Sequence, residues 1–372
     1  MPTIRLIYLS NALVPSREAS AVNVMLTCDA FAGLGPEVTL RARRGDLPGS
    51  PADYYALRHP FKIVYENRFK AAAWLLARSV WPRVRADEVY FGRKISAVSA
   101  LARRGHAVAV ELHAPPRNQR KYEELRAIID APRLHGVVVI SAQLRDEILK
   151  RYPQLDPARI LVAHDGAPSA ALRPPAARQA APVRAVYCGR LLRGKGVDTV
   201  LQAARRTPQV EFHVIGGSPE QIAALSPSPA NVVLHGHLPH AAAMALLPEF
   251  DIALAPYGEV VHGGRHKPDS ANLANWMSPI KLFEYMAAGL PIVTSDLPVL
   301  NEIVQHERTA LLTPPGHAAA LGEAVARLAA NADLRRQLAT TAQTMLAENY
   351  TWDRRARRIL DFLRPGNGTM AT

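Results

Sequence analysis

Short apolar runs alternate with stretches of helical periodicity along the first half of the chain. Apolar runs of this kind are typical of buried strands, and an apolar recurrence every three to four residues is typical of helices. The pattern predicts a helix over Ala19–Leu34, and a second one that Ser141 caps and Pro153 terminates. It predicts strands over Ile4–Leu9, Glu37–Ala42, Ala107–Glu111, Gly136–Ile140 and Ile160–Ala163.

The same alternation restarts in the second half of the chain. It predicts strands over Ala185–Cys188, Val210–Ile215, Val232–Leu234, Ile252–Ala255 and Pro291–Thr294. It predicts helices over Val197–Arg206, from about Ala241, over Pro279–Ala288 and over Thr351–Leu363. Strands that alternate with helices throughout are the pattern of parallel α/β domains, so the predicted fold class is α/β with two Rossmann-like halves. Small ligands favour the cleft between two such domains.

A segment without periodicity separates the two halves. Ala167–Arg184 is rich in proline and alanine, as interdomain linkers often are. A chain of 372 residues is also long enough for two hydrophobic cores. The predicted organisation is therefore a first domain over 1–168, a linker over 169–184, a second domain over 185–350, and a C-terminal helix with a tail over 351–372.

The composition is that of a globular protein, with 48% hydrophobic and 21% charged residues. The apolar runs are shorter than a membrane-spanning helix requires, and the start of the chain lacks the apolar core of a signal peptide. We therefore expect a cytoplasmic protein. Cys28 and Cys188 lie far apart in apolar surroundings and are interpreted as buried reduced thiols.

The net charge of +13 favours an anionic partner, such as nucleic acid, an anionic membrane or a phosphorylated small molecule. Part of this charge lies in the stretch 68–86, which mixes Arg and Lys with Trp74 and Trp81. Such a stretch can lie on the inner face of the cytoplasmic membrane as a basic amphipathic helix. It is equally consistent with a core-facing helix that has a solvated basic back.

The segment Gly189–Gly196, GRLLRGKG, follows an apolar strand and places two cations in a glycine-rich turn. It is one residue away from a phosphate-binding P-loop, but Gly196 has no hydroxyl to hold magnesium. Alternatively, Arg190 and Lys195 neutralise a diphosphate whose negative charge grows as it leaves. Two solvated surface cations are the simplest interpretation of these residues alone.

The segment Ser278–Gly289, SPIKLFEYMAAG, predicts a short helix. Ser278 is a favourable N-cap, Pro279 a favourable first residue and Gly289 a favourable C-terminal stop. The N-terminus of such a helix suits a phosphate. Glu284 lies on its otherwise apolar surface, where a buried carboxylate needs hydrogen-bond donors, such as ribose hydroxyls or a structural partner. The preceding loop, Pro256–Met277, is long enough to suggest a functional role.

With these two segments, the chain resembles the retaining glycosyltransferases of family 4, which are group 1 glycosyltransferases of the two-domain GT-B architecture. The resemblance is strongest over 185–350 and extends to nearly the whole chain. It implies that Arg190 and Lys195 bind the donor diphosphate and that Glu284 contacts the donor ribose. It also implies two domains that face across a cleft, with the C-terminal helix crossing back to the first. The loop before Glu284 would bind the sugar and phosphates through the backbone amides of Ser278, Pro279 and Ile280.

One residue departs from the family's pattern. The family carries an acidic residue eight positions before Glu284, where this chain has Trp276. The mode of binding of the donor sugar's hydroxyls is therefore open. We expect Glu259, in the preceding loop, to substitute for the missing carboxylate, and an inactive enzyme is the alternative.

Further site residues follow from the same resemblance. Ser20 and Asn23, in the first domain, are expected to touch the donor phosphate. His113, after the strand that carries Glu111, is expected near the transferred sugar and is assigned a catalytic role with Arg190 and Lys195. The glycines that follow two strands of the second domain, Gly216 and Gly236, are expected to line the donor site.

The resemblance implies a retaining transfer from a nucleotide-diphosphate sugar, with UDP or GDP as the carrier, without a metal or other cofactor. The expected acceptor is a carbohydrate or a lipid-linked sugar in bacterial cell-surface polysaccharide or glycolipid assembly. A small soluble acceptor, such as a secondary metabolite, is the alternative. More distant alternatives are a P-loop-like NTPase and a sugar-nucleotide epimerase. A nucleic-acid partner is not expected, because no recognition motif accompanies the positive charge.

Overall fold

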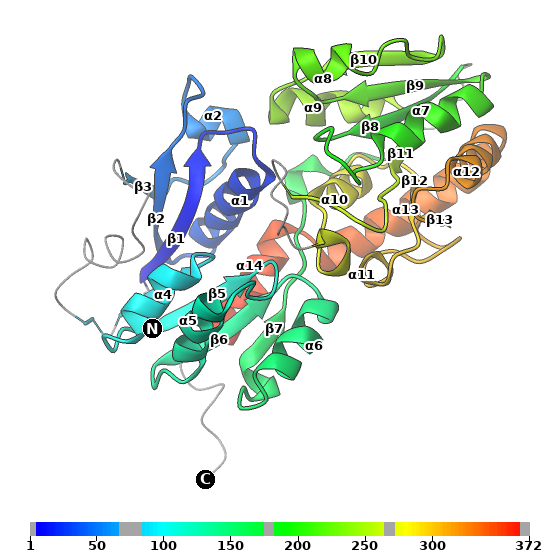
Figure 1. Cartoon of the computed structure of the whole chain (residues 1–372). Coiled ribbons are helices and arrows are strands. Elements are labelled where there is room, and N and C mark those ends of the chain that lie inside the picture. Colours follow the sequence, from blue (N-terminus) through cyan, green and yellow to red (C-terminus); the bar gives the residue numbers. More distant parts are fainter. Residues whose placement is uncertain (1–4, 67–83, 86, 175–181, 264–271, 365–372) are drawn as a thin grey trace. The chain divides into compact units, whose positions relative to one another are not determined.

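The structure is a computed structural model, and it describes residues 5–66, 84–85, 87–174, 182–263 and 272–364. Its contacts divide the chain into two units. Unit 1 comprises Met1–Asp165 and Trp352–Thr372, and unit 2 comprises Gly166–Thr351. Each unit is an α/β unit with one parallel sheet (Figure 1), which confirms the predicted fold class. The basic stretch 68–86 lies outside the described residues except for positions 84 and 85, so its role stays a prediction.

Unit 1 contains a seven-stranded parallel sheet with the order β3-β2-β1-β4-β5-β6-β7. The strand order reverses between β1 and β4, which are neighbours in the sheet but not in the sequence. The strands are β1 (Arg5–Val14), β2 (Glu37–Arg44), β3 (Lys62–Tyr65), β4 (Glu88–Gly92), β5 (Val108–Leu112), β6 (Leu134–Val139) and β7 (Ile160–Val162).

The described helices of unit 1 connect these strands, and the last one comes from the far end of the chain. They are α1 (Ala19–Gly33), α2 (Pro51–Tyr55), α4 (Ile95–Ala102), α5 (Gln119–Ile129), α6 (Ala142–Arg151) and α14 (Trp352–Leu363), with the 3-10 turn η1 (Pro157–Arg159). Helix α14 packs against α1 and β6. The C-terminal helix therefore belongs to unit 1, as predicted.

Unit 2 contains a six-stranded parallel sheet with the order β10-β9-β8-β11-β12-β13. This is the strand order of the dinucleotide-binding Rossmann fold, in which ligands bind beyond the carboxyl ends of the strands where the order reverses. In unit 2 that reversal lies between β8 and β11. The strands are β8 (Val183–Cys188), β9 (Val210–Ile215), β10 (Val232–Gly236), β11 (Ile252–Ala255), β12 (Ile292–Ser295) and β13 (Leu311–Thr313).

The described helices of unit 2 follow these strands in sequence. They are α7 (Val197–Arg206), α8 (Pro219–Ala223), α9 (His240–Leu246), α10 (Ile280–Ala287), α11 (Pro298–Asn301), α12 (Ala318–Ala330) and α13 (Ala332–Asn349), with the 3-10 turns η2 (Ser169–Ala171), η3 (Leu247–Glu249) and η4 (Leu273–Asn275). The hydrophobic core fills both faces of the sheet, and every residue of β11 and β12 is buried. Parallel strands that are covered on both faces form continuous apolar runs, which is why the sequence revealed them.

The structure corrects the predicted start of the helix after the long loop. Pro279 is its N-cap, with an extended ψ of 114°, and the helix begins at Ile280. Ser278 is therefore one position too early to cap it. The physical reason is the preceding turn η4, where the amide of Met277 donates to the carbonyl of Leu273 and ends one local structure just before the next begins. Gly289 ends the helix with a positive φ of 69°, as predicted.

The segment expected as a linker, 169–184, also contains regular structure. It includes the turn η2 and the first two residues of β8, whose Val183 pairs with Val210 of β9. Ala167 is fully buried, and its amide donates to the carbonyl of Tyr350. The sequence did not predict these contacts. Short segments that are held by partners distant in sequence show no hydrophobic periodicity.

Candidate functional site

The carboxyl ends of β8 and β11 meet where the strand order of unit 2 reverses. Tyr285 of α10 fixes this point, because its hydroxyl accepts a hydrogen bond from the Cys188 amide at 2.8 Å. The same hydroxyl lies 3.3 Å from the carbonyl of Leu254 in β11. Helix α10 is thereby held against the ends of both strands. Side chains that lie one turn before Tyr285 on the same face of α10 therefore also point toward the ends of β8 and β11.

The turn Gly189–Gly196 leaves β8 at this point and leads into α7. Gly194 and Gly196 both have positive φ, and a Cβ at either one would lie within 2.0 Å of a backbone oxygen in the segment after β11. The amide of Gly258 donates to the carbonyl of Gly194 at 3.0 Å. Only glycine allows the turn and the following segment to approach so closely. The turn is therefore fixed by the backbone, and its cations project from a rigid base.

Two predicted cations lie on this turn. Arg190 donates from its guanidinium to the carbonyl of Gly263 at 3.4 Å. The Lys195 ammonium lies 5.2 Å from the ring centre of Tyr257, which follows β11. Burial and the neighbouring charge of Arg190 lower the pKa of Lys195 to about 8. The two positive charges are near enough to repel each other, and within the part of the chain that the structure describes no carboxylate offsets the charge of Lys195.

A third cation lies beside them that the sequence did not single out. Lys281, in the first turn of α10, places its ammonium 3.9 Å from the ring centre of Tyr187 and 5.5 Å from that of Tyr257. Burial and the charge of Lys195 lower the pKa of Lys281 to about 7. Among the described residues, the candidate site thus holds two lysines against two tyrosine rings, with Arg190 beside Lys195.

Glu284 lies one turn further along α10 and has a partner. Its Oε1 is 2.7 Å from Nε2 of His240 at the start of α9. Burial by itself would lower the pKa of His240, but the hydrogen bond and the charge of Glu284 outweigh it and raise that pKa. Among the described residues, this contact uses only Oε1 of Glu284, which leaves the second carboxylate oxygen for a ligand.

The remaining predicted donor-site residues of unit 2 lie around the same edge of the sheet. Gly216 follows β9 and its amide donates to the carbonyl of Gly236 at the end of β10. A Cβ on Gly216 would lie 2.0 Å from the carbonyl oxygen of Gly189, so position 216 has no room for a side chain. Ser278 is buried, whereas Glu259 is exposed in the segment after β11. The ligand contacts expected of Ser278, Pro279, Ile280 and Glu259 stay predictions.

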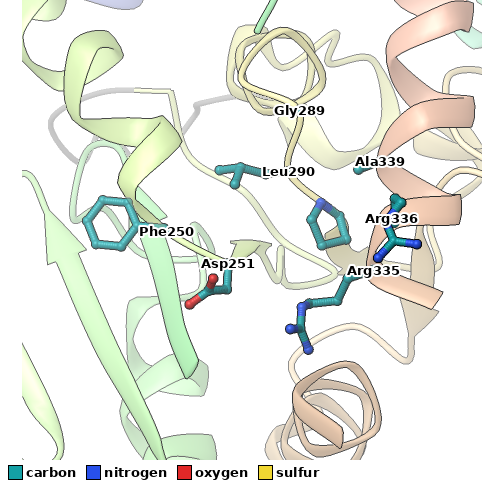
Figure 2. A pocket seen from close by; sticks show the side chains of 8 residues that line it. Phe250, Asp251, Gly289, Leu290, Arg335, Arg336 and Ala339 are labelled. Carbon is teal, nitrogen blue, oxygen red and sulfur yellow. The ribbon is translucent and has the colours of Figure 1, made fainter. Parts of the chain in front are cut away.

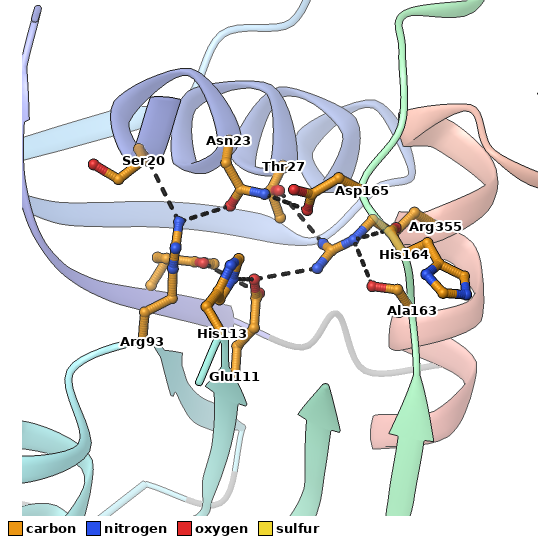
Figure 3. Close-up of polar contacts among 11 residues, drawn as sticks. Ser20, Asn23, Thr27, Arg93, Glu111, His113, Ala163, His164, Asp165 and Arg355 are labelled. Carbon is orange, nitrogen blue, oxygen red and sulfur yellow. Dashed lines mark hydrogen bonds and ion pairs between the residues drawn. The ribbon is translucent and has the colours of Figure 1, made fainter. Parts of the chain in front are cut away.

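The predicted residues of unit 1 form a buried charged network at the carboxyl ends of its own strands (Figure 3). Glu111 in β5 contacts Nε2 of His113 at 2.5 Å and the guanidinium of Arg355 at 3.2 Å. Burial opposes ionisation of Glu111, but the charge of Arg355 and the hydrogen bond from His113 hold its pKa well below the usual range. Burial and the charge of Arg93 lower the pKa of His113 to about 4, so its ring is neutral at pH 7.

The same network includes two predicted residues of α1, Asn23 through its side chain and Ser20 through its backbone carbonyl. Asn23 is 2% exposed, and its amide donates to Asp165 at 2.6 Å while its oxygen accepts from Arg93 at 3.0 Å. Arg93 also reaches the carbonyl of Ser20 at 3.5 Å. Burial raises the pKa of Asp165 to about 7, against the charge of Arg355. Asn23 thus has a structural role, and its expected contact with a donor phosphate stays a prediction, as does that of Ser20.

The pocket in Figure 2 lies at the opposite edge of the unit 2 sheet. Its lining includes Asp251 and Pro291, which directly precede β11 and β12, and Arg335 of α13. The Arg335 guanidinium already donates to the carbonyls of Leu328 and Ala329. A cavity of about 10 Å³ has room for roughly one water molecule, so this pocket does not serve a sugar nucleotide.

The described residues hold neither a cluster suited to a metal ion nor a helix suited to span a membrane. No three His, Cys, Asp or Glu side chains within the described ranges gather where they could hold a metal ion. No helix in the same ranges is both long and apolar enough to cross a bilayer. Independence from a metal and peripheral membrane association both stay predictions.

Sequence reasoning missed Lys281, His240 and Arg355. Lys281 stands in the quoted segment SPIKLFEYM as the only cation, which was a usable signal. His240 and Arg355 are distant in sequence from their carboxylate partners, so no local pattern could have found them.

Comparison with known proteins supports the resemblance. Residues 182–331 match the family described as glycosyl transferases group 1, which is the family recognised in the sequence. Alpha-maltose-1-phosphate synthase of Mycolicibacterium smegmatis is 26% identical over 62% of this chain and 62% of its own length. Glycogen synthase of Mycobacterium tuberculosis is 30% identical over 58% of this chain and 51% of its own length. The chain thus spans only between half and two thirds of these relatives.

Solved structures show the same fold over the whole length. The Anabaena protein Alr3699/HepE, solved in complex with UDP, covers 97% of this chain and 99% of its own, with a TM-score of 0.71 at 14% identity. Sucrose-phosphate synthase from Thermosynechococcus elongatus covers 96% and 98%, with a TM-score of 0.70 at 17% identity. The glycosyltransferase WaaG, described as involved in lipopolysaccharide biosynthesis, has a TM-score of 0.68 at 15% identity. The two-domain GT-B architecture is therefore confirmed.

Proposed function

We propose that this protein is a retaining glycosyltransferase that transfers a sugar from a nucleotide-diphosphate sugar to a hydroxyl acceptor without a metal ion. The observation that carries the proposal is the cluster of Arg190, Lys195 and Lys281 at the switch point of unit 2. Three cations that gather at the carboxyl ends of β8 and β11 suit a diphosphate, since ligands bind at this place in such sheets. The match of residues 182–331 to group 1 glycosyltransferases supports the same assignment.

The chemistry follows from the charges. When the glycosyl bond breaks, negative charge grows on the departing diphosphate. Fixed cations that are already in place stabilise that charge without the cost of reorganising solvent. Lys195 is suited to this role because its turn is fixed by backbone contacts. In this mechanism the departing phosphate itself takes the acceptor's proton, so the protein needs no strong base, and positioning accounts for much of the rate.

We assign the ribose to Glu284. Its carboxylate is fixed by His240 through one oxygen, and a hydroxyl of the ribose can donate to the other. Alr3699/HepE is described as a complex with UDP, and elsewhere with UDP and glucose and with UDP-glucose. A uridine nucleotide is therefore the first donor to test here, with a guanosine nucleotide as the alternative.

Unit 1 carries features that suit an anionic acceptor. Lys94, at the N-cap of α4, has its pKa lowered first by burial and then by the charges of Lys121, Arg120 and Arg43. Glu124 opposes this effect but does not cancel it. A cluster of cations at the carboxyl edge of this sheet favours an acceptor that carries phosphate, as a lipid-linked sugar does. We propose such an acceptor, in cell-surface polysaccharide or glycolipid assembly; a small neutral soluble acceptor is the alternative.

The neutral His113 fits a role in binding rather than in proton transfer at neutral pH. With Nε2 held by Glu111, its other ring nitrogen is left to contact a sugar hydroxyl. We therefore assign His113 to binding the transferred sugar.

The first experiment is thermal unfolding of the full chain with UDP, GDP, ADP, dTDP or magnesium-ATP, each also in EDTA. A ligand at 100 times its Kd stabilises by about 2.7 kcal/mol, which is a measurable rise in Tm. We expect one nucleoside diphosphate to stabilise the protein equally with and without EDTA. Stabilisation by magnesium-ATP alone would refute the proposal in favour of an NTPase.

The acceptor is tested separately. The same assay with a radiolabelled donor sugar compares a polyprenyl-diphosphate sugar with the matching free sugar. Transfer to the lipid-linked compound alone is expected, and equal transfer to the free sugar would favour a soluble acceptor. Sedimentation with anionic liposomes at low salt tests the membrane association assigned to the stretch 68–86, and failure to sediment would reject it.

A further inference from the structure

Lys281 has an unusual environment for a lysine. Its Nζ is buried, and among the residues that the structure describes it has no hydrogen-bond partner. Its ammonium faces the rings of two tyrosines, at 3.9 Å from the ring centre of Tyr187 and 5.5 Å from that of Tyr257. A buried ammonium without a partner is costly, and an aromatic face offsets only part of that cost. Such a cation is stabilised when an anion binds beside it.

The end of β8 is shaped to leave room for this ammonium. A Cβ at Gly189 would lie 2.8 Å from Nζ of Lys281, so any side chain there would displace it. The Tyr187 hydroxyl donates to the carbonyl of Arg190 at 3.0 Å, which fixes the ring under Lys281. The ammonium therefore occupies a defined position at the strand end.

Lys195 and Lys281 share one aromatic ring. Their Nζ atoms lie 5.2 Å and 5.5 Å from the ring centre of Tyr257. They come from different elements, one from the turn before α7 and the other from the start of α10. Two like charges held this close destabilise each other in the empty site, and a ligand with two adjacent negative groups reverses that repulsion.

We propose that Lys281 binds the donor diphosphate together with Lys195 and takes up a proton from solvent when the donor binds. This inference rests on the proposed function, since it names a further residue of the same site. In the empty site the ammonium loses its proton readily, because burial and the charge of Lys195 lower the pKa of Lys281 to about 7. The bound diphosphate adds negative charge, raises that pKa again and restores the charged form.

Among the groups around Lys281, Lys195 also titrates between pH 6 and pH 9, because burial and the charge of Arg190 lower its pKa to about 8, so it adds a fraction of a proton to the uptake. Burial raises the pKa of Cys188 to about 12 and that of Tyr257 well above its ordinary value, so both remain protonated. His240 is already engaged by Glu284 on the next turn of α10. The titratable and charged groups that face Lys281 are Tyr187, Cys188, Lys195, Tyr257 and Glu284.

The test is calorimetric titration of the full chain with UDP and with GDP at pH 8, in two buffers that differ in ionisation enthalpy. At this pH the terminal phosphate, with a pKa of roughly 6, is already ionised, so proton uptake reports on the protein. We expect the wild type to take up about one proton per bound nucleotide. Its Kd should weaken as the pH rises from 6.5 to 9, roughly in proportion to the loss of the charged lysine.

Two variants and a control make the test specific. Lys281→Met should weaken the Kd at least about tenfold and lower the proton uptake by most of one proton, which leaves the smaller part that Lys195 contributes. Lys281→Arg keeps a permanent charge and should bind with much less proton uptake and a flatter pH dependence. Lys150→Met, which removes an exposed lysine of α6, should match the wild type.

The outcomes separate the two proposals. Wild-type protein that binds neither nucleotide would overturn the proposed function and this inference with it. If the wild type binds, an unchanged Kd and unchanged proton uptake in Lys281→Met would overturn the inference alone. An unaltered pH dependence in Lys281→Arg would do the same.

Discussion

Replacing Lys281 by methionine should stabilise the protein in the absence of nucleotide. Methionine keeps the length and the apolar contacts of the side chain against the two tyrosines but carries no charge. The wild-type ammonium is buried without a hydrogen-bond partner among the described residues, so the folded state disfavours its charged form. The same substitution therefore removes a binding group and a source of instability at once.

The size of the gain follows from the pKa. Folding lowers the pKa of Lys281 from 10.5 to about 7. The unfolded chain thus holds more protons between pH 7 and pH 10.5, and the wild-type free energy of unfolding rises as the pH rises through this window. At pH 7 the buried lysine lowers the wild-type free energy of unfolding by nearly the full amount that its pKa shift implies. With 1.36 kcal/mol for each pKa unit, and a discount for solvent screening, Lys281→Met should gain about 2–4 kcal/mol.

Urea denaturation and calorimetry of the nucleotide-free protein at pH 7 and pH 10 measure this gain. The Tm at pH 7 should rise by roughly 5–15 °C, and the difference should shrink to about 1 kcal/mol at pH 10, where the wild-type lysine is neutral in the fold. Lys150→Met should show no gain at either pH. A Lys281→Met variant that is no more stable than the wild type at pH 7, or equally stabilised at both pH values, would refute the reasoning.

Four further predictions test other parts of the molecule. Lys195→Ala should lower kcat about 100-fold or more at saturating donor, because transition-state charge is no longer stabilised; unchanged turnover in a sugar-transfer assay would remove Lys195 from the mechanism. Glu284→Ala should raise the Kd of UDP about tenfold, but hardly change that of 2′,3′-dideoxy-UDP, since the carboxylate binds ribose hydroxyls; an equal loss for both nucleotides in calorimetry would contradict this. Arg355→Met should destabilise the protein by about 3–5 kcal/mol in urea denaturation, because it leaves a buried carboxylate unpaired, whereas the exposed Arg357→Met on the same helix serves as the control with a change within about 0.5 kcal/mol. Asp165 has a folded-state pKa raised from 3.8 to about 7, so the wild type should lose stability as the pH rises from 4 to 7, and Asp165→Asn should flatten that loss; an unchanged pH profile would show that Asp165 does not titrate in this range.

The sequence predicted many of the regular elements of unit 2 with little error, although β13 (Leu311–Thr313) and α8 (Pro219–Ala223) were not predicted. The predicted bounds of α7, β9 and β11 coincide with those of the structure. These elements are long or fully buried, so their apolar periodicity is uninterrupted. By contrast, β4 (Glu88–Gly92) was not predicted at all, although it lies at the centre of the unit 1 sheet. Glu88 and Tyr90 at its start make it look less apolar than its neighbours.

The sequence predicted several charged residues of the candidate site, but not the contacts that bring Lys281 and His240 next to them. Glycine spacing located the turn that carries Arg190 and Lys195, because glycine is the residue that such a backbone needs. The burial of Lys281 could not be inferred, since it depends on Tyr187 of β8 and on Tyr257 in the segment after β11. The same holds for the contact of His240 with Glu284, which joins residues 44 positions apart.

Because α14 belongs to unit 1, the two units complete their folding in a fixed order during synthesis of the chain. Unit 2 is continuous in sequence and can complete its core as soon as Thr351 has left the ribosome. Unit 1 cannot complete its core at that point. Glu111 needs the guanidinium of Arg355 as its ion-pair partner, and α1 needs the apolar face of α14 to pack against. Until then the carboxylate of Glu111 has its hydrogen bond with His113 but lacks its cationic partner from α14. The unit that is translated first is therefore the one that finishes folding last. A C-terminal truncation that removes α14 would destabilise the N-terminal unit.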